Sequence, residues 1–229
     1  MKLQKETNAH GKWYDDACGT AFALELIGER WALLIIREMM FGPRRFTDLR
    51  AGLPSVSAKV LTERLEGLEH AGIVQRRQLP PPAAAQVYEL TEWGYLAEES
   101  IQALGRWAAR SPGHDPTLPL SAASLMMSFR TMFDPARAVG LCLTGAINVG
   151  VEHFSVDVRS QHLCAERGEP ESTDFVLSAP VASVIAGAVY GKLPLADLAN
   201  AGLKVAGDEA AALRFIDLFH LPAKLGLST

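Results

Sequence analysis

The segment from residue 42 to residue 71, GPRRFTDLRAGLPSVSAKVLTERLEGLEHA, limits the possible folds more than any other part of this chain of 229 residues. Its pattern predicts two short helices joined by a turn. The first helix covers residues 46–51 and is followed by Gly52 and Pro54, the residue types that most often end a helix. The second helix continues to about residue 70. Two short helices joined in this way are typical of a helix-turn-helix.

The second of these helices has one apolar and one polar face. Ser55 and Ser57 offer side-chain oxygens to the free N–H groups at its start. At about 100° per residue, Leu61, Leu65 and Leu68 fall on one face. The opposite face carries Lys59, Thr62, Glu63 and Glu66. Such a helix can dock on a core and enter the major groove of DNA, about 12 Å wide, to present side chains to base edges. An ordinary amphipathic surface helix is the alternative interpretation.

The flanking residues predict the rest of a winged helix. Helices over residues 15–28 and 31–41 come first, and the second is apolar almost all round, which is typical of a buried helix. Strands over residues 73–79 and 86–90 follow, around a proline-rich loop that can be neither helix nor central strand. Thr91 then caps a long final helix, whose apolar surface exceeds what a small domain can bury and therefore indicates a dimer.

Several motifs in this region resemble those of the HxlR-type winged-helix transcriptional regulators. They are Cys18, LIGERW at 26–31, GPRRF at 42–46, Ser57, KVLTERL at 59–65, LE at 68–69, AGIV at 71–74 and YELT at 88–91. The resemblance covers roughly residues 15–110 in the right order. It implies a homodimer that binds a palindromic operator in double-stranded DNA. The wing departs from the family pattern, because its PPPAAA tip lacks the basic residue that often contacts phosphate.

The helix geometry and the resemblance together predict which residues contact DNA. Lys59, Thr62 and Glu63 are candidates for contacts with base edges, and solvated surface is the alternative. The surrounding arginines are candidates for phosphate contacts, which give affinity and salt dependence without sequence information. The complete predicted DNA-binding set is Arg44, Arg45, Arg50, Ser57, Lys59, Thr62, Glu63, Arg64, Arg76 and Arg77. Any of these arginines can instead pair with a nearby glutamate.

Cys18 is a redox candidate. It stands at the start of the first predicted helix, where free N–H groups favour the thiolate, and it matches the sensing cysteine of some members of the HxlR-type family. Asp15 and Asp16 oppose thiolate formation. The alternative is a buried free cysteine that acts as a small hydrophobe.

Charge and cysteine usage narrow the class of protein. The formal net charge of −4 lies in residues 113–229, because Lys+Arg and Asp+Glu balance in residues 1–112. A local patch in the first half must therefore do any DNA binding. The three scattered cysteines form no metal-ligand spacing or disulfide framework, and no apolar run suits a signal peptide or a membrane span. We therefore expect a cytoplasmic protein with no metal and no membrane contact.

The second half predicts an α+β domain. Residues 111–117 form a polar, proline-rich break, so we expect domains at 1–111 and 117–229. A helix over 120–133 leads into strands at 138–147, 152–158, 161–166 and 174–177, then a helix at 180–190, a strand at 203–206 and a helix at 208–219. The turns at 148–150 and 167–170 suit consecutive antiparallel connections. The overall expectation is a winged helix-turn-helix followed by an α+β domain with a mainly antiparallel sheet.

This second domain resembles the sterol carrier protein fold, most strongly over about residues 172–219. The motifs are FVL at 175–177, YGKL at 190–193, AGLKV at 201–205 and AGD at 206–208. The resemblance implies a tunnel for an apolar small molecule between a sheet and covering helices. The candidate lining residues are Met127, Phe133, Leu141, Leu143, Phe154, Val156, Phe175, Val184, Phe215 and Phe219. Plain core packing is the alternative for each of them.

The sequence carries no catalytic constellation. His153, His162 and Cys164 could form a ligand trio, but exposed strand residues explain them more simply. We therefore expect a DNA-binding transcriptional regulator, not an enzyme and without a cofactor, whose operator binding responds to an apolar molecule in the second domain. Repression is the commoner outcome in the family that the first domain resembles. The alternatives are a thiol-based redox regulator acting through Cys18, and a lipid or acyl carrier without a regulatory role.

Overall fold

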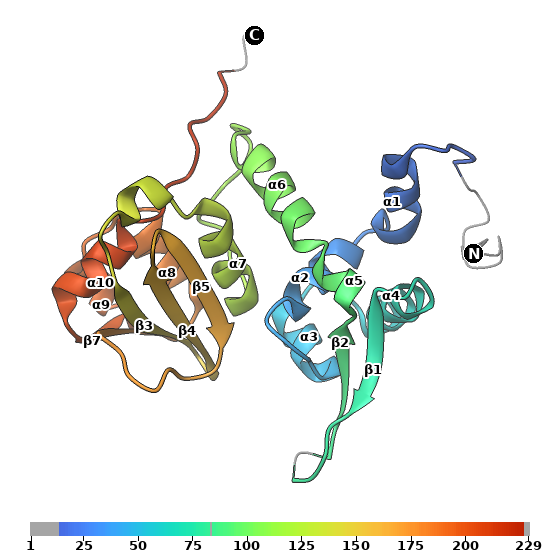
Figure 1. Ribbon diagram of the computed structural model, residues 1–229, viewed down its shortest axis with the longest axis horizontal. Helices are drawn as coiled ribbons and strands as arrows, with labels where there is room; N and C mark the ends of the chain where they lie inside the picture. Colours follow the sequence, from blue (N-terminus) through green and yellow to red (C-terminus); the bar gives the residue numbers. More distant parts are fainter. Residues whose placement is uncertain (1–13, 83, 227–229) are drawn as a thin grey trace. The chain divides into compact units, whose positions relative to one another are not determined.

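The structure, a computed structural model, describes residues 14–82 and 84–226. The chain divides into two compact units, residues 1–101 and 102–229, which we call unit 1 and unit 2 (Figure 1). The division falls inside helix α6 (Glu98–Ala109), earlier in the chain than the polar break at residues 111–117. The domain limits 1–111 and 117–229 therefore stay a prediction. The N-terminal residues before Tyr14 lie outside the described part.

Four helices build the body of unit 1. They are α1 (Gly19–Ile27), α2 (Ala32–Met39), α3 (Phe46–Gly52) and α4 (Ala58–His70). The second predicted helix is confirmed as α2, whose Ile35, Ile36 and Met39 are fully buried. The apolar face predicted for the helix after the turn is buried as well, through Leu61, Leu65 and Leu68. The first predicted helix is shorter than expected, because residues 15–18 are not helical and α1 begins at Gly19.

A two-stranded wing follows the helix pair. Strand β1 (Val74–Gln78) pairs antiparallel with β2 (Gln86–Leu90), as predicted. The backbone of Arg44 extends this pairing, because its N–H donates to the Tyr88 carbonyl and its carbonyl accepts from the Tyr88 N–H, each at 2.8 Å. Thr91 caps the next helix by accepting from the Gly94 N–H. The wing is therefore tied to the turn before α3.

The long final helix predicted after the wing is interrupted. The chain forms α5 (Glu92–Tyr95) and then α6, with residues 96–97 between them. At the interruption the N–H groups of Leu96 and Ala97 donate to carbonyls three residues earlier, at 3.2 Å. Such tightened hydrogen bonds close one turn and let the next helix begin separately. The prediction of one continuous helix from Thr91 was wrong.

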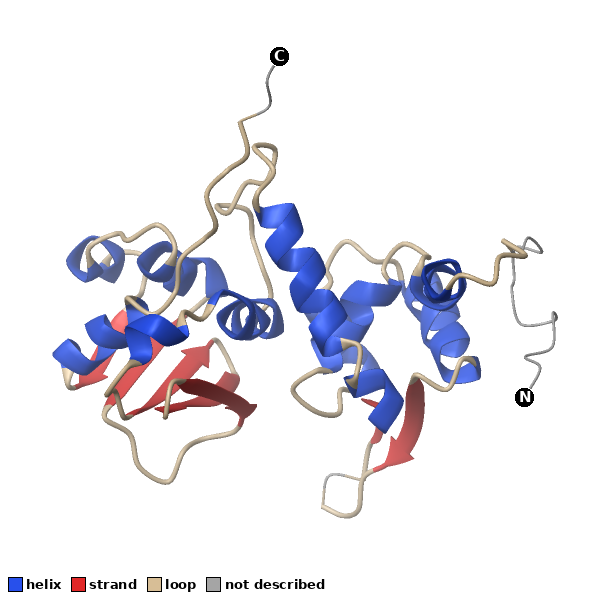
Figure 2. Cartoon of the chain, turned by 45° about the horizontal axis from the view of Figure 1, so that its top comes forward, coloured by secondary structure: helices blue, strands red, loops and turns tan. Residues whose placement is uncertain are grey.

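Besides the larger part of α6, unit 2 contains a five-stranded sheet and four α-helices within the described residues. The strands are β3 (Leu143–Val149), β4 (Glu152–Arg159), β5 (His162–Arg167), β6 (Phe175–Ala179) and β7 (Lys204–Gly207). The helices are α7 (Ala122–Met132), α8 (Ala182–Val189), α9 (Leu195–Ala199) and α10 (Glu209–Ile216), with a 3-10 turn, η2, at Pro135–Ala138. The helices gather on one face of the sheet, whereas its other face is not covered by a helix (Figure 2). This confirms an α+β unit.

The strand order, β5-β4-β3-β6-β7, differs from the predicted run of consecutive antiparallel neighbours. The turn at residues 167–170 does not connect neighbours, because β6 crosses over to pair in parallel with β3. Gly145 and Phe175 face each other in this pair, and the Phe175 ring occupies the space that a side chain at Gly145 would need. Packing across the sheet, rather than turn chemistry, therefore places β6. Helix α9 was not predicted, and the first strand begins later than predicted, at Leu143.

The core of unit 2 is an aromatic cluster between the helices and the sheet. The Phe129 ring of α7 stacks on Phe219 with ring centres 4.7 Å apart, and Phe215 lies 4.9 Å from Phe219. Phe175 reaches Phe215 from the sheet at 5.1 Å. The alternation predicted for β4 is confirmed, because Phe154, Val156 and Val158 are buried whereas Ser155 and Asp157 are partly exposed.

Candidate nucleic-acid interface

Helix α4 presents the predicted polar face. The Ser57 hydroxyl accepts a hydrogen bond from the Val60 N–H at 3.2 Å, so Ser57, one of the two predicted capping serines, is the N-cap. Lys59 and Thr62 are exposed on this helix, and the Lys59 ammonium lies 3.8 Å from the Glu63 carboxylate, one helical turn away. This pair is solvent-exposed and contributes little to stability, so it can be exchanged for contacts with DNA. The geometry leaves Lys59, Thr62 and Glu63 available as base-edge candidates.

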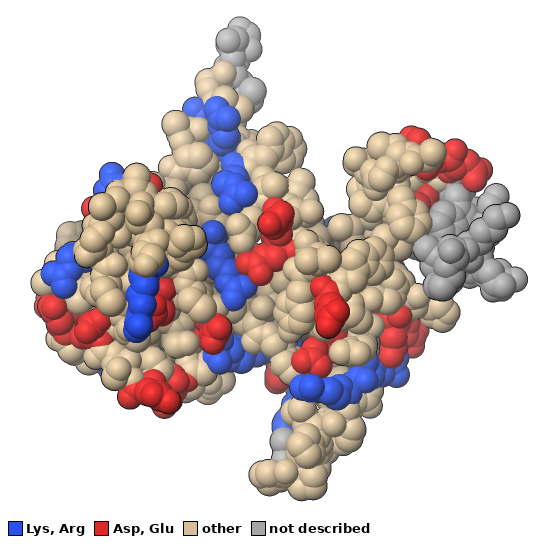
Figure 3. All heavy atoms as spheres, in the orientation of Figure 1, with Lys and Arg blue, Asp and Glu red and all other residues tan. Residues whose placement is uncertain are grey.

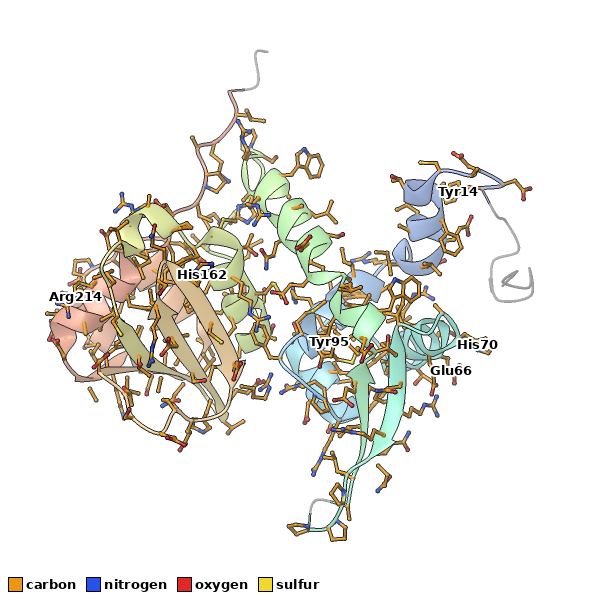
Figure 4. All side chains as sticks on the ribbon, viewed as in Figure 1. Tyr14, Glu66, His70, Tyr95, His162 and Arg214 are labelled. Atoms are coloured by element: carbon orange, nitrogen blue, oxygen red, sulfur yellow. The ribbon has the colours of Figure 1, made fainter. Side chains whose placement is uncertain are left out.

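The same helix carries polar residues beyond the predicted set. Glu66 and His70 project from α4 away from the core of unit 1 (Figure 4) and are exposed. Glu66 continues the stripe of Thr62 along the helix, since the two are four residues apart. A carboxylate at this position repels phosphate, so the end of α4 near His70 is a poorer DNA surface than its start.

Exposed arginines lie near α4 on α3 and on the wing. Arg45 and Arg50 are exposed at the start and in the last turn of α3. On β1, Arg76 pairs with Glu69 at 3.0 Å and Arg77 pairs with Glu89 at 3.2 Å. Figure 3 shows Lys and Arg atoms gathering at the base of the wing beside Asp and Glu atoms. The wing arginines must therefore leave their carboxylates, or share them, to contact phosphate.

Two residues of the predicted phosphate-contact set make contacts within unit 1. The Arg64 guanidinium donates to the Glu29 carboxylate at 2.8 Å and to the Arg30 carbonyl at 3.2 Å, which ties α4 to the segment between α1 and α2. Arg44 is only 7% exposed, and its backbone belongs to the wing pairing described above. Arg44 is thus buried, and the Arg64 side chain is only 18% exposed and is held by Glu29. We assign Arg64 and Arg44 to the stability of unit 1.

A buried carboxylate under the helix-turn-helix was missed by the sequence analysis. Glu38 of α2 is 1% exposed and accepts from the neighbouring Arg37 side chain at 2.8 Å. Its other oxygen lies where a side chain on Gly52 would begin, because a β-carbon there would be 2.5 Å from Glu38 Oε2. Gly52 is the last residue of α3, so its small size, rather than helix breaking, explains its presence. The available signal was one acidic residue within a helix that is otherwise largely apolar.

Cys18 lies at the N-terminus of α1 and is exposed. The backbone N–H groups of Ala21 and Thr20, and the Thr20 side chain, lie at the start of α1 and lower the pKa of the Cys18 thiol. Asp16 is engaged elsewhere, since its carboxylate accepts from the Cys18 backbone N–H at 2.9 Å. The expected helix-terminus effect on the thiol is therefore present, and the alternative of a buried cysteine is wrong for Cys18.

The candidate ligand-lining residues of unit 2 fall into two groups. Those that are buried are Met127, Leu143, Phe154, Val156, Phe175, Phe215 and Phe219. Phe133, Leu141 and Val184 are partly exposed. Phe175, Phe215 and Phe219 belong to the aromatic cluster and contact one another, as a packed core requires. Their role as ligand contacts stays a prediction.

Within the part of the chain that the structure describes, no group of three or more His, Cys, Asp or Glu residues could hold a metal ion. His153 and His162 do not join Cys164 in a group that could hold a metal ion; His153 instead bonds the Asn148 side chain at 2.9 Å. His162 is exposed, and its Nδ1 lies 2.8 Å from the Ser160 carbonyl oxygen. No described helix is both long and apolar enough to cross a membrane.

Comparisons with known proteins find relatives for the first half of the chain. Residues 26–115 match the sequence model of the HxlR-like helix-turn-helix family. The HTH-type transcriptional regulator YodB of Bacillus subtilis (strain 168) is 41% identical over 86 residues, which span 38% of this chain and 77% of YodB. The uncharacterized HTH-type transcriptional regulator YtfH of Escherichia coli (strain K12) is 32% identical over 97 residues, 42% of this chain and 77% of YtfH.

Solved structures show the same pattern of coverage. The reduced form of YodB from B. subtilis is 36% identical, covers 44% of this chain and 100% of its own, and has a TM-score of 0.39. The redox regulator HypR in its oxidized form is 33% identical, covers 40% of this chain and 94% of its own, and has a TM-score of 0.36.

Proposed function

Because the chain belongs to the HxlR-type helix-turn-helix family of transcriptional regulators, we propose that it binds a palindromic operator as a homodimer. We further propose that an apolar small molecule in unit 2 changes the affinity for that operator. The observation that carries the first proposal is helix α4, which is capped by Ser57, docked by three buried leucines and exposed along Lys59, Thr62 and Glu63. We expect the protein to act in the cytoplasm and not as an enzyme.

The proposed interface combines α4 with the arginines that remain at the surface. Thr62 and Lys59 contact base edges, and Arg45 and Arg50 contact phosphates on either side of the helix. Arg76 and Arg77 join them at the base of the wing once their carboxylate partners are displaced. The described residues of the wing tip, 80–82 and 84–85, carry no charged side chain, so we expect the tip to add little electrostatic affinity.

The exposed apolar surface of unit 1 and α6 supports the proposed homodimer. None of the nine residues of α1, all of them described, is buried, although the helix is strongly apolar. Leu24 of α1 is 48% exposed, and Leu104 and Trp107 of α6 are 47% and 74% exposed. Large exposed apolar side chains such as these are typical of a protein interface. A second copy of the chain is the partner that a palindromic operator requires.

The proposed ligand response depends on unit 2. Helices on one face of the sheet cover an apolar layer, which is the arrangement that the sterol carrier resemblance implies. A ligand can modulate operator binding only if it binds the DNA-competent and incompetent states with different affinity. A small change in the relative positions of the two α4 helices in the dimer is enough to weaken operator binding, because the half-sites must lie about 34 Å apart.

The regulator proposal is tested by selecting bound sequences from a pool of random duplex DNA with the full chain. We expect an enriched palindrome with two half-sites separated by about one helical turn. A Thr62→Ala variant should enrich a relaxed version of the same palindrome. The regulator proposal fails if the recovered sequences share no motif and binding falls only weakly as salt increases. A lipid or acyl carrier would then be the better interpretation.

One observation favours a second function, a thiol-based redox regulator acting through Cys18. The Cys18 thiol is exposed, and its pKa is lowered by hydrogen bonds at the N-terminus of α1. Among the similar solved structures, one is named a redox regulator, and YodB is named in its reduced form. A Cys18→Ser variant separates the two functions: a redox regulator loses its response to mild oxidant, whereas a ligand-responsive regulator keeps its response to an apolar molecule.

A further inference from the structure

The C-terminal segment of unit 2 is fastened to the end of helix α6. We define residues 220–226 as the C-terminal strap (Figure 1). The Lys224 ammonium donates to the carbonyls of Ala109, Ser111 and His114 at 3.0, 3.0 and 2.8 Å, and lies 3.3 Å from His114 Nδ1. The Leu225 N–H donates to the Arg110 carbonyl at 2.8 Å. One exposed side chain therefore holds the last residue of a helix and the loop that follows it.

The Ala109 carbonyl is one of the groups that a helix leaves without an intrahelical partner, whereas the Ser111 and His114 carbonyls belong to the loop after α6. The last four carbonyls of a helix lack internal donors, and the C-terminal end of a helix attracts cations. Arg110 and Ser111 still donate backwards into the last turn of α6, to the Trp107 and Ala108 carbonyls at 3.2 and 3.0 Å. Lys224 thus acts as a C-cap that comes from more than a hundred residues away in the sequence.

The other end of the strap begins at the aromatic core. Phe219, directly before the strap, stacks on Phe129 and forms a backbone bridge with Phe133. Its carbonyl accepts from the Lys192 ammonium at 3.1 Å. The strap therefore joins a residue that is locked into the core of unit 2 to the last turn of α6.

That last turn carries the most exposed large side chain of α6. Trp107 is 74% exposed and stands two residues before Ala109, whose carbonyl Lys224 holds. We infer that Lys224 is a positioning residue: it fixes the last turn of α6, and with it Trp107, for contact with a second copy of this chain. A change at Phe219 in the core can reach the dimer through the strap. This inference rests on the proposed homodimer and deepens the proposed regulation.

The test compares full-length variants at one exposed position. Lys224→Met removes the donors and the charge but keeps the length of the side chain, whereas Lys224→Arg keeps donors and charge. Lys204→Met, on exposed β7, is the matched control for loss of a surface lysine. Amide hydrogen exchange reads the order of the α6 end through Arg110, Ser111 and His114, whose N–H groups donate locally. Sedimentation equilibrium gives the dimer dissociation constant.

For Lys224→Met we expect the exchange rate at these amides to rise roughly tenfold, because local opening becomes easier. The dimer dissociation constant should rise by a similar factor, so that the dimer is weaker. Lys224→Arg and Lys204→Met should match the unmodified chain. Unchanged exchange in Lys224→Met would show that the strap does not hold α6. Faster exchange with an unchanged dimer constant, or a monomeric unmodified chain, would overturn the positioning role. Both effects present without any preferred DNA sequence would support the strap while the operator proposal fails.

Discussion

The two units differ in where their predicted functional residues lie: they are mainly exposed in unit 1 and mainly buried in unit 2. In unit 1 the DNA-binding candidates lie on the exposed face of α4, such as Lys59 and Thr62, with apolar residues beneath them. In unit 2 most of the ligand candidates, such as Phe175, are buried among other apolar residues. Periodicity distinguishes exposed from buried residues, so it can isolate an exposed site. It cannot distinguish a side chain that lines a ligand site from one that fills a core.

The largest expected effect addresses that ambiguity in unit 2. Phe219→Ala removes a fully buried ring that contacts three other phenylalanines, so it should cost about 3–5 kcal/mol of stability if the ring is core. Urea unfolding of the full chain, followed separately by Trp fluorescence and by circular dichroism, measures the loss. Phe133→Ala, which removes a partly exposed ring, should cost clearly less. A loss near or below 1 kcal/mol for Phe219→Ala would mean that the ring borders open space and would favour a ligand site.

The next effect sharpens the description of unit 1. Gly52→Ala forces a β-carbon against the Glu38 carboxylate, and overpacking of this kind costs about 1–3 kcal/mol. We expect lower thermal stability and weaker operator binding, because the turn between α3 and α4 must shift. Gly67→Ala, inside α4 with open space around it, is the matched control and should be stabilising by about 0.5–1 kcal/mol. Equal effects of the two substitutions would show that Glu38 does not limit the turn.

A third pair of variants separates base contacts from phosphate contacts. Thr62→Ala should lose about 1–3 kcal/mol of discrimination between the operator and a mutated operator. Arg45→Ala should weaken binding to both sequences equally and reduce the slope of log affinity against log salt by about 1. Fluorescence anisotropy titrations at several salt concentrations measure both quantities. The interface is assigned wrongly if Thr62→Ala changes only the salt slope.

A smaller effect concerns Arg64, which we assign to the stability of unit 1 rather than to DNA contact. Arg64→Ala should cost about 1 kcal/mol of stability, since the ion pair with Glu29 is partly exposed and screened by solvent. Its salt slope for DNA binding should equal that of the unmodified chain. Arg50→Ala, at an exposed arginine of α3, should instead leave stability unchanged and reduce the salt slope for DNA binding. A reduced salt slope in Arg64→Ala would return Arg64 to the set of phosphate contacts.

The smallest expected effect is on the reactivity of Cys18. Because hydrogen bonds to Cys18 lower its pKa, whereas burial raises the pKa of the Cys164 thiol, Cys18 should alkylate first as pH rises. The thiolate is the reactive form, so the Cys18 rate should fall only when the pH drops below its lowered pKa. Iodoacetamide labelling followed by peptide mass spectrometry gives both rates. Equal pH profiles for the two thiols would remove the physical support for a redox role.

The sequence predicted local structure well where one physical signal dominated. The capping serines and three leucines at helical spacing locate α4, and alternating residues locate β4. The exposed surface of α4 followed directly from the same periodicity. Cys18 at a helix terminus was predictable for the same reason, because the effect is local.

Features that depend on distant partners were not predictable. The pairing of β6 with β3 depends on Phe175 fitting over Gly145, residues that are thirty positions apart. Arg64 looks like any surface cation in sequence, and only the fold brings Glu29 to it. The cap that Lys224 places on α6 has the same origin. Each of these contacts joins residues that no local pattern relates.

The most direct test of the regulator proposal is binding of the purified chain to its own promoter region. Fluorescence anisotropy across a salt series would be recorded with and without an organic extract of the host cells. We expect tight binding with a steep salt dependence, a clear preference over random DNA, and an affinity that the extract changes. Equal binding to promoter and random DNA at all salt concentrations would contradict operator recognition by α4. Promoter preference that ignores the extract but is lost under mild oxidant would move the regulatory role from unit 2 to Cys18.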